Sequence, residues 1–134
     1  MAAGYSGTPL AKKLGFKDGM RVFVRAMPDS VRAAIEENAA PEFIVRSGKN
    51  MPAAHVFATR ASDLEASLVK LRTALAPDGM VWASWPKKAA KMDTDITEDV
   101  VRALALPLGF VDVKVCAVDE VWSGLKLVIR KELR

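Results

Sequence analysis

Two segments of the 134-residue chain are apolar on both of the faces that a β-strand presents. They are MRVFVRA at residues 20–26 and GMVWASW at residues 79–85. Because alternate side chains of a strand point to opposite faces, a strand without a polar face must be covered on both sides. The two segments therefore exclude a sheet with one face in water, and they require helices on both faces.

Between these two strands, apolar residues recur at the spacing of an α-helix. This spacing is clearest over residues 62–75, where leucines recur every three or four positions and where Ser62 and Glu65 match a capping box. The stretch APDG is expected to end this helix in a turn. Shorter helices are predicted to begin at Pro9, at Pro28 and at Asp93 or Thr94, and to end before Gly15, near Asn38 and at Pro107.

Strands and helices alternate along the chain, which is typical of parallel strands joined by right-handed crossovers. The last apolar runs, within residues 111–119 and 125–134, predict an antiparallel hairpin. The predicted fold class is α/β, a Rossmann-like three-layer sandwich with a mostly parallel sheet of about six strands. Residues 1–134 form a single domain in this interpretation, with an N-terminal arm and a short helix over residues 1–18.

The cysteine and histidine content narrows the class of protein. Cys116 is the only cysteine and His55 the only histidine, so the sequence predicts neither an intrachain disulfide nor a metal site. The longest uncharged apolar run, ALALPLGFV, is far shorter than the ~18 residues that span a bilayer, and the N-terminal residues lack the apolar stretch of a secretory leader. We therefore expect a protein of the reducing cytoplasm without membrane attachment.

Three long blocks of the sequence are distinctive: GYSGTPLAKKLG at residues 4–15, SWPKKAAKMDTDITEDVVR at residues 84–102, and GFVDVKVCAVDEVWSGLKLVIRK at residues 109–131. They resemble a family of small bacterial proteins known only as a domain of unknown function. The resemblance implies a bacterial source and a shared fold, and it supplies no activity and no catalytic residue.

From Ala54 onward the chain has a helix ending in LAPDG, a strand MVWAS, another helix and a terminal hairpin. This order resembles the second half of class I S-adenosylmethionine-dependent methyltransferases. The resemblance implies that the last strand inserts between its two predecessors and runs antiparallel to them.

The first half of the chain departs from the methyltransferase pattern. In such enzymes a glycine-rich turn after the first strand lets the backbone approach the cofactor, and an acidic residue after the second strand holds the ribose. Here the first strand leads into VFVRAMPDSV without a glycine, and the second leads into RSGKN without a carboxylate. Met27 and Pro28 stand where glycines would be expected, and Pro28 lacks an amide donor. We therefore expect no cofactor, and in particular no S-adenosylmethionine in the usual mode.

The first candidate site follows the second two-sided strand, at Ser84, Trp85, Lys87 and Lys88. Ligands of open α/β sheets bind beyond the carboxyl ends of the strands, and a helix beginning near Thr94 would point free amides at the same crevice. These residues predict a site for a phosphate or a carboxylate. In the alternative interpretation, Trp85 caps the core and the two lysines face water.

The second candidate site is the turn DEVWSG of the C-terminal hairpin, with Asp119, Glu120, Trp122 and Ser123. The predicted topology brings this turn to the same edge of the sheet as the lysines. There a carboxylate can act as a general base or an ion-pair partner, and Trp122 can act as a stacking surface. In the alternative interpretation, Trp122 folds back onto the core and Asp119 pairs with a lysine.

No catalytic residue is predicted. Ser84 and Ser123 are hydroxyl nucleophiles at this edge, but His55 precedes a predicted strand and should lie at the opposite, amino end. Cys116 lies in an apolar run, where a buried thiol is the common case. The loop GYSGT at residues 4–8 lacks the Walker Lys-Ser/Thr pair and is interpreted as an arm that packs across the sheet edge.

The leading functional hypothesis is a non-catalytic binding or regulatory module that holds a small anionic ligand or a protein partner. The alternative is a divergent group transferase with an atypical cofactor mode, which requires Asp119 or Glu120 to converge with Lys87 around an enclosed pocket. Nucleic-acid binding ranks last, because the net charge of +4 comes from interspersed acidic and basic residues without a basic block.

Overall fold

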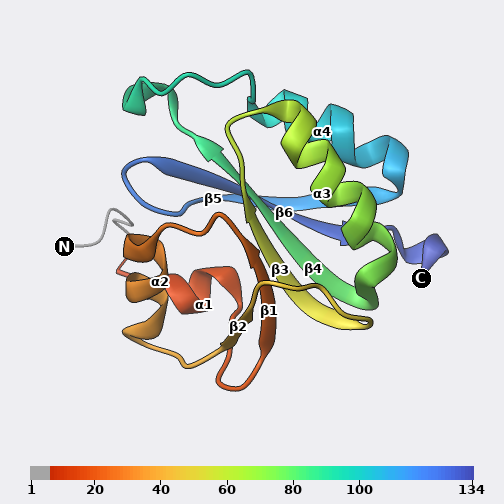
Figure 1. Ribbon diagram of the computed structural model, residues 1–134, viewed down its shortest axis with the longest axis horizontal. Coiled ribbons are helices and arrows are strands. Elements are labelled where there is room, and N and C mark those ends of the chain that lie inside the picture. The colour runs from red at the N-terminus through yellow and green to blue at the C-terminus, as the bar shows by residue number, and fades with distance from the viewer. Residues whose placement is uncertain (1–6) are drawn as a thin grey trace.

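The computed structural model describes residues 7–134 and contains one six-stranded sheet in the order β2-β1-β3-β4-β6-β5 (Figure 1). The strands are β1 (Arg21–Arg25), β2 (Glu42–Ile44), β3 (Met51–Phe57), β4 (Leu75–Pro86), β5 (Phe110–Ala117) and β6 (Trp122–Ile129). Strands β2, β1, β3 and β4 are parallel, whereas β6 runs antiparallel to both of its neighbours. The predicted mostly parallel α/β sheet is confirmed, and so is the insertion of the last strand between β4 and β5.

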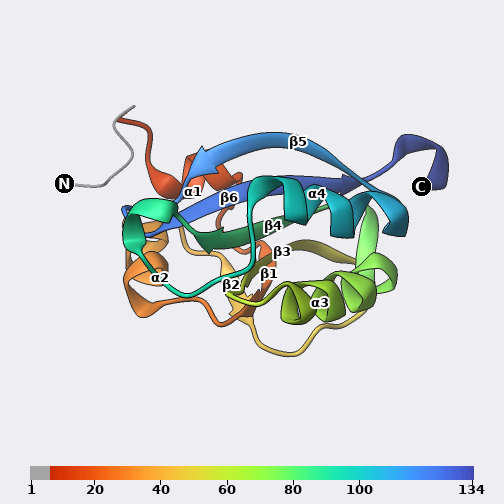
Figure 2. The same cartoon turned by 90° about the horizontal axis from the view of Figure 1, so that it is seen from above.

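Helices cover both faces of the sheet, as Figure 2 shows from above. They are α1 (Leu10–Leu14), α2 (Asp29–Glu36), α3 (Ala61–Ala74) and α4 (Glu98–Ala105), with single 3-10 turns η1 (Lys88–Ala90), η2 (Leu106–Leu108) and η3 (Lys131–Leu133). Helices α1 and α2 pack on one face, and α3 and α4 pack on the other. No helix within residues 7–134 is long and apolar enough to cross a membrane. The arm predicted at residues 4–8 lies largely outside the described residues.

Strand β4 is buried on both faces, as its sequence predicts. Val81 and Ala83 pack with α3 and α4, whereas Trp82 packs with α1 and α2. The indole Nε1 of Trp82 donates a 2.8 Å hydrogen bond to the carbonyl oxygen of Leu14. The largest fully buried side chain therefore has no unsatisfied donor, and it connects the centre of the sheet to the end of α1.

The capping box predicted at Ser62 and Glu65 is not formed. Helix α3 begins at Ala61, so Ser62 already lies in its first turn, and Arg60 at the N-cap makes no capping hydrogen bond with its side chain. Instead, Oδ1 of Asp95 accepts a 2.7 Å hydrogen bond from the Ala61 amide. The cap of α3 thus comes from a loop 34 residues later in the chain.

The stretch APDG at residues 76–79 is not a turn after α3. Strand β4 begins at Leu75, directly after the helix, and Leu75 pairs with Met51. The register then shifts, so that residues 76–79 bulge out of the ladder. A Cβ atom on Gly79 would lie 2.8 Å from the Met51 carbonyl oxygen, so only glycine fits where the strand rejoins its partner.

Helix α4 begins later than predicted. Thr97 occupies its N-cap, rather than Asp93 or Thr94, and the Thr97 hydroxyl accepts a 3.2 Å hydrogen bond from the Val100 amide. The Thr94 hydroxyl donates to the Thr59 carbonyl oxygen at 2.7 Å instead. This bond fixes the segment before α4 beside the end of β3.

The two edge strands of the sheet are short or irregular. At one edge, β2 contains three residues. At the other, the pairing of β5 with β6 shifts register between Asp112 and Lys114. Neither edge is therefore a long, regular ladder of unpaired backbone groups.

We predict that Asp95→Ala lowers the free energy of unfolding by about 1 kcal/mol, because it removes the cap of α3. The matched control is Asp93→Ala. Asp93 lies 2.7 Å from Arg60, but its side chain is 84% exposed, so its loss should cost less than about 0.5 kcal/mol. Urea unfolding followed by circular dichroism measures both values, and equal losses would contradict the capping role of Asp95.

Candidate functional site

A hollow of about 520 Å³ opens where β4 ends and α4 begins. The loop between these elements and one residue of β6 complete its wall. Its lining residues are Trp85, Pro86, Lys87, Lys88, Met92, Thr94, Ile96, Thr97, Glu98 and Ser123. We call this hollow the lysine pocket. It brings together five residues that the sequence analysis selected: Trp85, Lys87, Lys88, Thr94 and Ser123.

Lys87 and Lys88 reach the pocket because β4 stays paired with the C-terminal hairpin up to its last residue. The Lys87 amide donates a 2.7 Å hydrogen bond to the Val121 carbonyl oxygen, and Lys88 begins the turn η1. Within residues 7–134 neither ammonium group has an ion-pair or hydrogen-bond partner. Two uncompensated positive charges therefore line the pocket.

The first turn of α4 forms the opposite wall. Amides in the first turn of a helix lack intrahelical acceptors and carry partial positive charge. Glu98 is the acidic residue of the lining, and its Oε2 lies 2.5 Å from Nη2 of Arg102. Arg102 also binds Asp112 at 2.9 Å, and this hydrogen bond is the main cause of the raised pKa of the guanidinium. Arg102 is shared among Glu98, Asp99 and Asp112, so the Glu98 carboxylate is held within its own helix and is not paired with either lysine.

The turn residues Asp119, Glu120 and Trp122 do not line the lysine pocket. Oδ1 of Asp119 accepts 2.8 Å hydrogen bonds from the amides of Val121 and Trp122, so this carboxylate closes the turn. Trp122 folds back toward the core and meets Phe57 edge-to-face, with 5.2 Å between ring centroids. Trp122 therefore lies as the alternative interpretation expected, folded back toward the core. That interpretation also paired Asp119 with a lysine, but Asp119 binds backbone amides instead.

Ser84 lies on the face of β4 that is directed away from the lysine pocket. Its Oγ is 2.8 Å from Nε2 of His55. The expectation that His55 lies at the amino end of its strand is wrong, because β3 begins at Met51 and His55 is near its middle. Pro52, which resembles a turn residue in the sequence, occupies the point where the pairing of β3 with β4 shifts register.

His55 and Ser84 do not complete a catalytic triad. His55 is fully buried beside the rings of Phe16 and Phe57, and its Nδ1 has no hydrogen-bond partner among the described residues. No carboxylate therefore orients the imidazole. Burial lowers the pKa of His55 from 6.5 to about 3, so the ring is neutral near pH 7.

A smaller hollow, of about 200 Å³, lies at the carboxyl ends of β1 and β3. Its lining residues are Arg25, Ala26, Phe57, Ala58, Thr59, Asp63 and Trp122. We call it the β1 hollow. Ala26 adopts a left-handed backbone conformation with φ of 56°, and Met27 packs against the core cluster of α1 and α2. The chain thus turns sharply after β1 without a glycine.

A third hollow, of about 280 Å³, lies between β1 and α3 and contains Arg25 and Lys70. Sequence reasoning missed it, because its residues come from β1, α3 and the connection after β2, which no local pattern links. The one available signal was Arg25, a charged residue at the carboxyl end of an apolar strand.

A protein-family profile described as "Protein of unknown function (DUF3052)" matches residues 11–131. The chain belongs to the DUF3052 family. The three blocks singled out in the sequence thus correspond to a family of unknown function, as the resemblance implied. No curated protein matches this DUF3052 chain.

Several solved structures similar to the DUF3052 protein are methyltransferases. The ribosomal protein L11 methylase from Lactobacillus delbrueckii subsp. bulgaricus superposes with a TM-score of 0.59 at 12% identity, over 90% of this chain and 74% of that one. The S-adenosylmethionine-dependent methyltransferase from Aquifex aeolicus has a TM-score of 0.58 at 16% identity, over 90% and 87%. The TehB-like methyltransferase from Corynebacterium glutamicum has a TM-score of 0.54 at 10% identity, over 96% and 91%. At these identities the likeness shows the fold, which is Rossmann-like and methyltransferase-like.

The residues after β1 do not fit S-adenosylmethionine in the mode that a glycine-rich loop provides. The turn places the Ala26 methyl group at the β1 hollow, and Pro28 offers no amide at the start of α2. Phe57 and Trp122 pack against each other in its wall. The remaining 200 Å³ is below the range of about 300–1,000 Å³ typical of ligand pockets.

We predict that millimolar S-adenosylmethionine does not raise the melting temperature of the DUF3052 protein. A ligand that binds only the folded state stabilises it in proportion to the logarithm of its concentration over Kd, so even weak binding would appear as a shift. Differential scanning fluorimetry measures the temperature, with adenosine as the matched control. A reproducible, concentration-dependent rise with S-adenosylmethionine would contradict the prediction.

We predict that stability falls as the pH drops below 6.5, because the unfolded chain then binds a proton at His55 that the folded chain rejects down to about pH 3. Below 6.5 the slope approaches about 1.4 kcal/mol per pH unit. Above pH 6.5 His55 is neutral in both the folded and the unfolded chain, so its burial no longer lowers the free energy of unfolding. Urea unfolding across this range measures the slope.

The control for this measurement is His55→Gln, which keeps a polar partner for Ser84 and does not titrate. Below pH 6.5 the free energy of unfolding of this variant should change less steeply with pH than that of the wild type, because the variant lacks the one proton that His55 binds on unfolding. Parallel pH profiles for the two proteins would mean that His55 is not the titrating group.

Proposed function

We propose that this DUF3052 protein is a binding or regulatory module that holds a small anionic ligand in the lysine pocket. The observation that carries the proposal is the pair of unpartnered ammonium groups, Lys87 and Lys88, in a hollow of about 520 Å³. A volume in this range accommodates a small metabolite.

The surroundings of the lysines support an anionic ligand. The pocket lies beyond the carboxyl end of β4, at the edge where open α/β sheets bind their ligands. The first turn of α4 lines it and adds partial positive charge. Trp85 and Ile96 supply apolar wall, so a ligand with a carboxylate or a phosphate on a small carbon skeleton matches both parts of the lining.

A protein partner that inserts an acidic side chain is the alternative occupant of the same pocket. The transferase alternative has less support, because it needs a carboxylate of the hairpin turn beside Lys87. Oδ1 of Asp119 is bound to two amides of its own turn, and neither Asp119 nor Glu120 lines the pocket. The proposed function therefore rests on binding rather than on group transfer.

We predict that Lys87→Ala/Lys88→Ala weakens binding of phosphate or citrate about tenfold or more, because charge-assisted hydrogen bonds to the anion are lost. Amide chemical shifts of the α4 first turn, followed by NMR during titration, give Kd. The double variant should retain the wild-type melting temperature, since neither ammonium group has a partner in the described chain.

The matched control is Lys17→Ala/Lys131→Ala, which removes the same charge from exposed positions outside the lysine pocket. Native mass spectrometry of protein purified from its own host provides the second measurement. A bound small molecule lost only from the Lys87/Lys88 variant supports the proposal, whereas equal affinity for the anions in all three proteins overturns it.

A further inference from the structure

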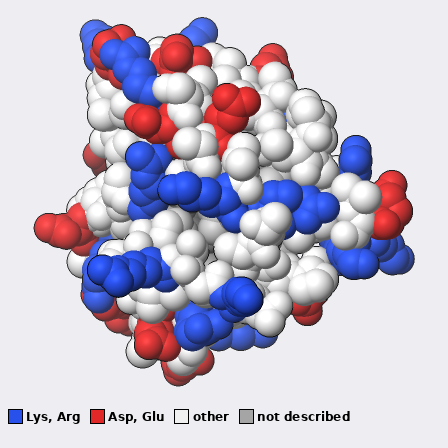
Figure 3. Space-filling model, turned by 45° about the vertical axis from the view of Figure 1, so that its right-hand side comes forward, with Lys and Arg blue, Asp and Glu red and all other residues white. Residues whose placement is uncertain are grey.

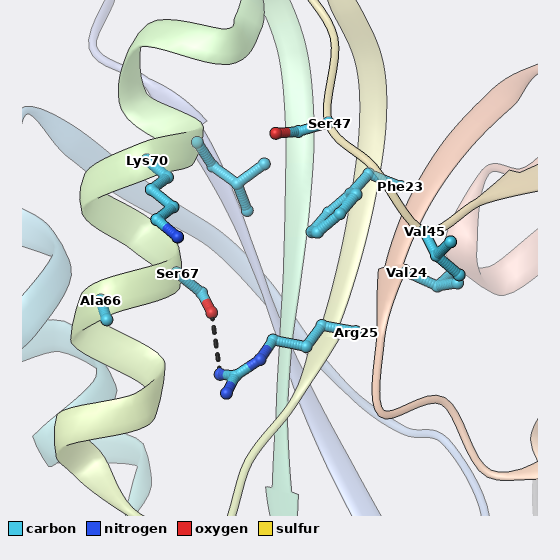
Figure 4. A pocket seen from close by; sticks show the side chains of 9 residues that line it. Phe23, Val24, Arg25, Val45, Ser47, Ala66, Ser67 and Lys70 are labelled. Carbon is cyan, nitrogen blue, oxygen red and sulfur yellow. Dashed lines mark hydrogen bonds between the residues drawn. The ribbon is translucent and has the colours of Figure 1, made fainter.

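The hollow between β1 and α3, which we call the α3 groove, has an apolar floor. Phe23 of β1 forms part of this floor, and Val45, which follows β2, lies at its rim (Figure 4). Leu71 of α3 also lines the groove. Val45 is 80% exposed. The groove thus presents apolar surface that no element among residues 7–134 covers.

The groove exists because the two faces of β1 are covered differently. On one face, Val22 and Val24 pack under α1 and α2. On the other face, α3 packs mainly against β3 and β4, and the β2–β3 connection at residues 45–50 contains no helix. That connection passes on the same side as α3, as Figure 2 shows. Val45 and Ser47 of the connection line the groove together with Phe23.

Two cations project into the groove from opposite sides, Arg25 from β1 and Lys70 from α3 (Figure 4). Nη1 of Arg25 donates hydrogen bonds to Oγ of Ser67 at 3.0 Å and to the carbonyl oxygen of Asp63 at 3.1 Å. Ser67 is only 8% exposed, so it is a fixed anchor. These bonds occupy one nitrogen of the guanidinium and orient the others.

Neither cation has a carboxylate partner. The ion pairs of residues 7–134 involve Arg32, Arg60 and Arg102, and no carboxylate lines the groove. An arginine held by neutral acceptors beside an unpaired lysine is electrostatically complementary to an oxyanion. Figure 3 shows that Lys and Arg also form a band across this side of the molecule, which raises the local positive potential.

We propose that the α3 groove is a second binding site, for a small ligand with one carboxylate or phosphate group attached to an apolar body. The oxyanion binds between the Arg25 guanidinium and the Lys70 ammonium, and the apolar body packs on Phe23. The volume of about 280 Å³ lies just below the range of about 300–1,000 Å³ typical of ligand pockets, so it limits the ligand to a single substituted ring or a short chain. The site is independent of the lysine pocket and of the function proposed for it.

The test uses three small probes that share an aromatic ring: benzoate, phenyl phosphate and the neutral benzyl alcohol. Each is titrated into the full chain, and amide chemical shifts at Ser47, Ser67 and Lys70 report binding. We expect at least one of the two anions to bind the α3 groove at least tenfold more tightly than benzyl alcohol. Comparison of benzoate with phenyl phosphate distinguishes a carboxylate site from a phosphate site.

Lys70→Gln and Arg25→Gln should each weaken binding of the preferred anion about tenfold or more. Lys70 has no side-chain partner in the described chain, so its variant keeps the test valid even if Arg25→Gln destabilises α3. In the charge-matched control Lys131→Gln and in the Lys87→Ala/Lys88→Ala variant, the shifts at Ser47, Ser67 and Lys70 should titrate as in the wild type, whatever the probe does at the lysine pocket. These controls separate the α3 groove from the lysine pocket.

Three results would overturn the proposal. The first is equal binding of benzyl alcohol and the two anions, and the second is anion binding that Lys70→Gln leaves unchanged. The third is salt-sensitive binding of a single-stranded oligonucleotide that shifts the same amides more strongly than any probe, which would make this surface a polyanion site.

Discussion

Coverage of β4 on both faces is the constraint on which the rest of this fold depends. Trp82 directs its indole into the layer of α1 and α2 and binds the carbonyl oxygen of Leu14, while Val81 and Ala83 pack under α3 and α4. The strand is also paired along both sides, with β3 and β6. Once β4 is central, its carboxyl end must open between α4 and the hairpin, so the lysine pocket follows from core packing.

The order of elements could be predicted from the sequence, because two-sided apolar strands and leucine spacing are local signals. The insertion of the last strand between β4 and β5 is implied by the resemblance to methyltransferases and not by any local pattern. The cap of α3 by Asp95 could not be predicted, since Ser62 and Glu65 form a better local pattern than the distant carboxylate that binds the helix. His55 was misplaced for a related reason: a proline normally ends a strand, but here it falls at a register shift.

The candidate sites likewise include one that the sequence predicts locally and one that it does not. Lys87, Lys88 and Thr94 lie within one short stretch between a strand and a helix, so their proximity was predictable from the end of β4. Arg25 and Lys70 line the same groove because the β2–β3 connection leaves part of β1 uncovered, which depends on tertiary packing and not on any short motif. The sheet has a methyltransferase-like topology. The turn after β1, however, is made by Ala26 and not by the glycine-rich loop that holds the cofactor in such enzymes.

The irregular edges of the sheet have a consequence for how copies of the protein meet. A strand from another molecule can extend a sheet only along a straight run of unpaired amides and carbonyl groups. Strand β2 offers a run of three residues, and β5 is interrupted by a bulge between Asp112 and Lys114. These edges disfavour intermolecular strand pairing, so the exposed valines of β5 can remain at the surface without turning the sheet into a template for fibrils.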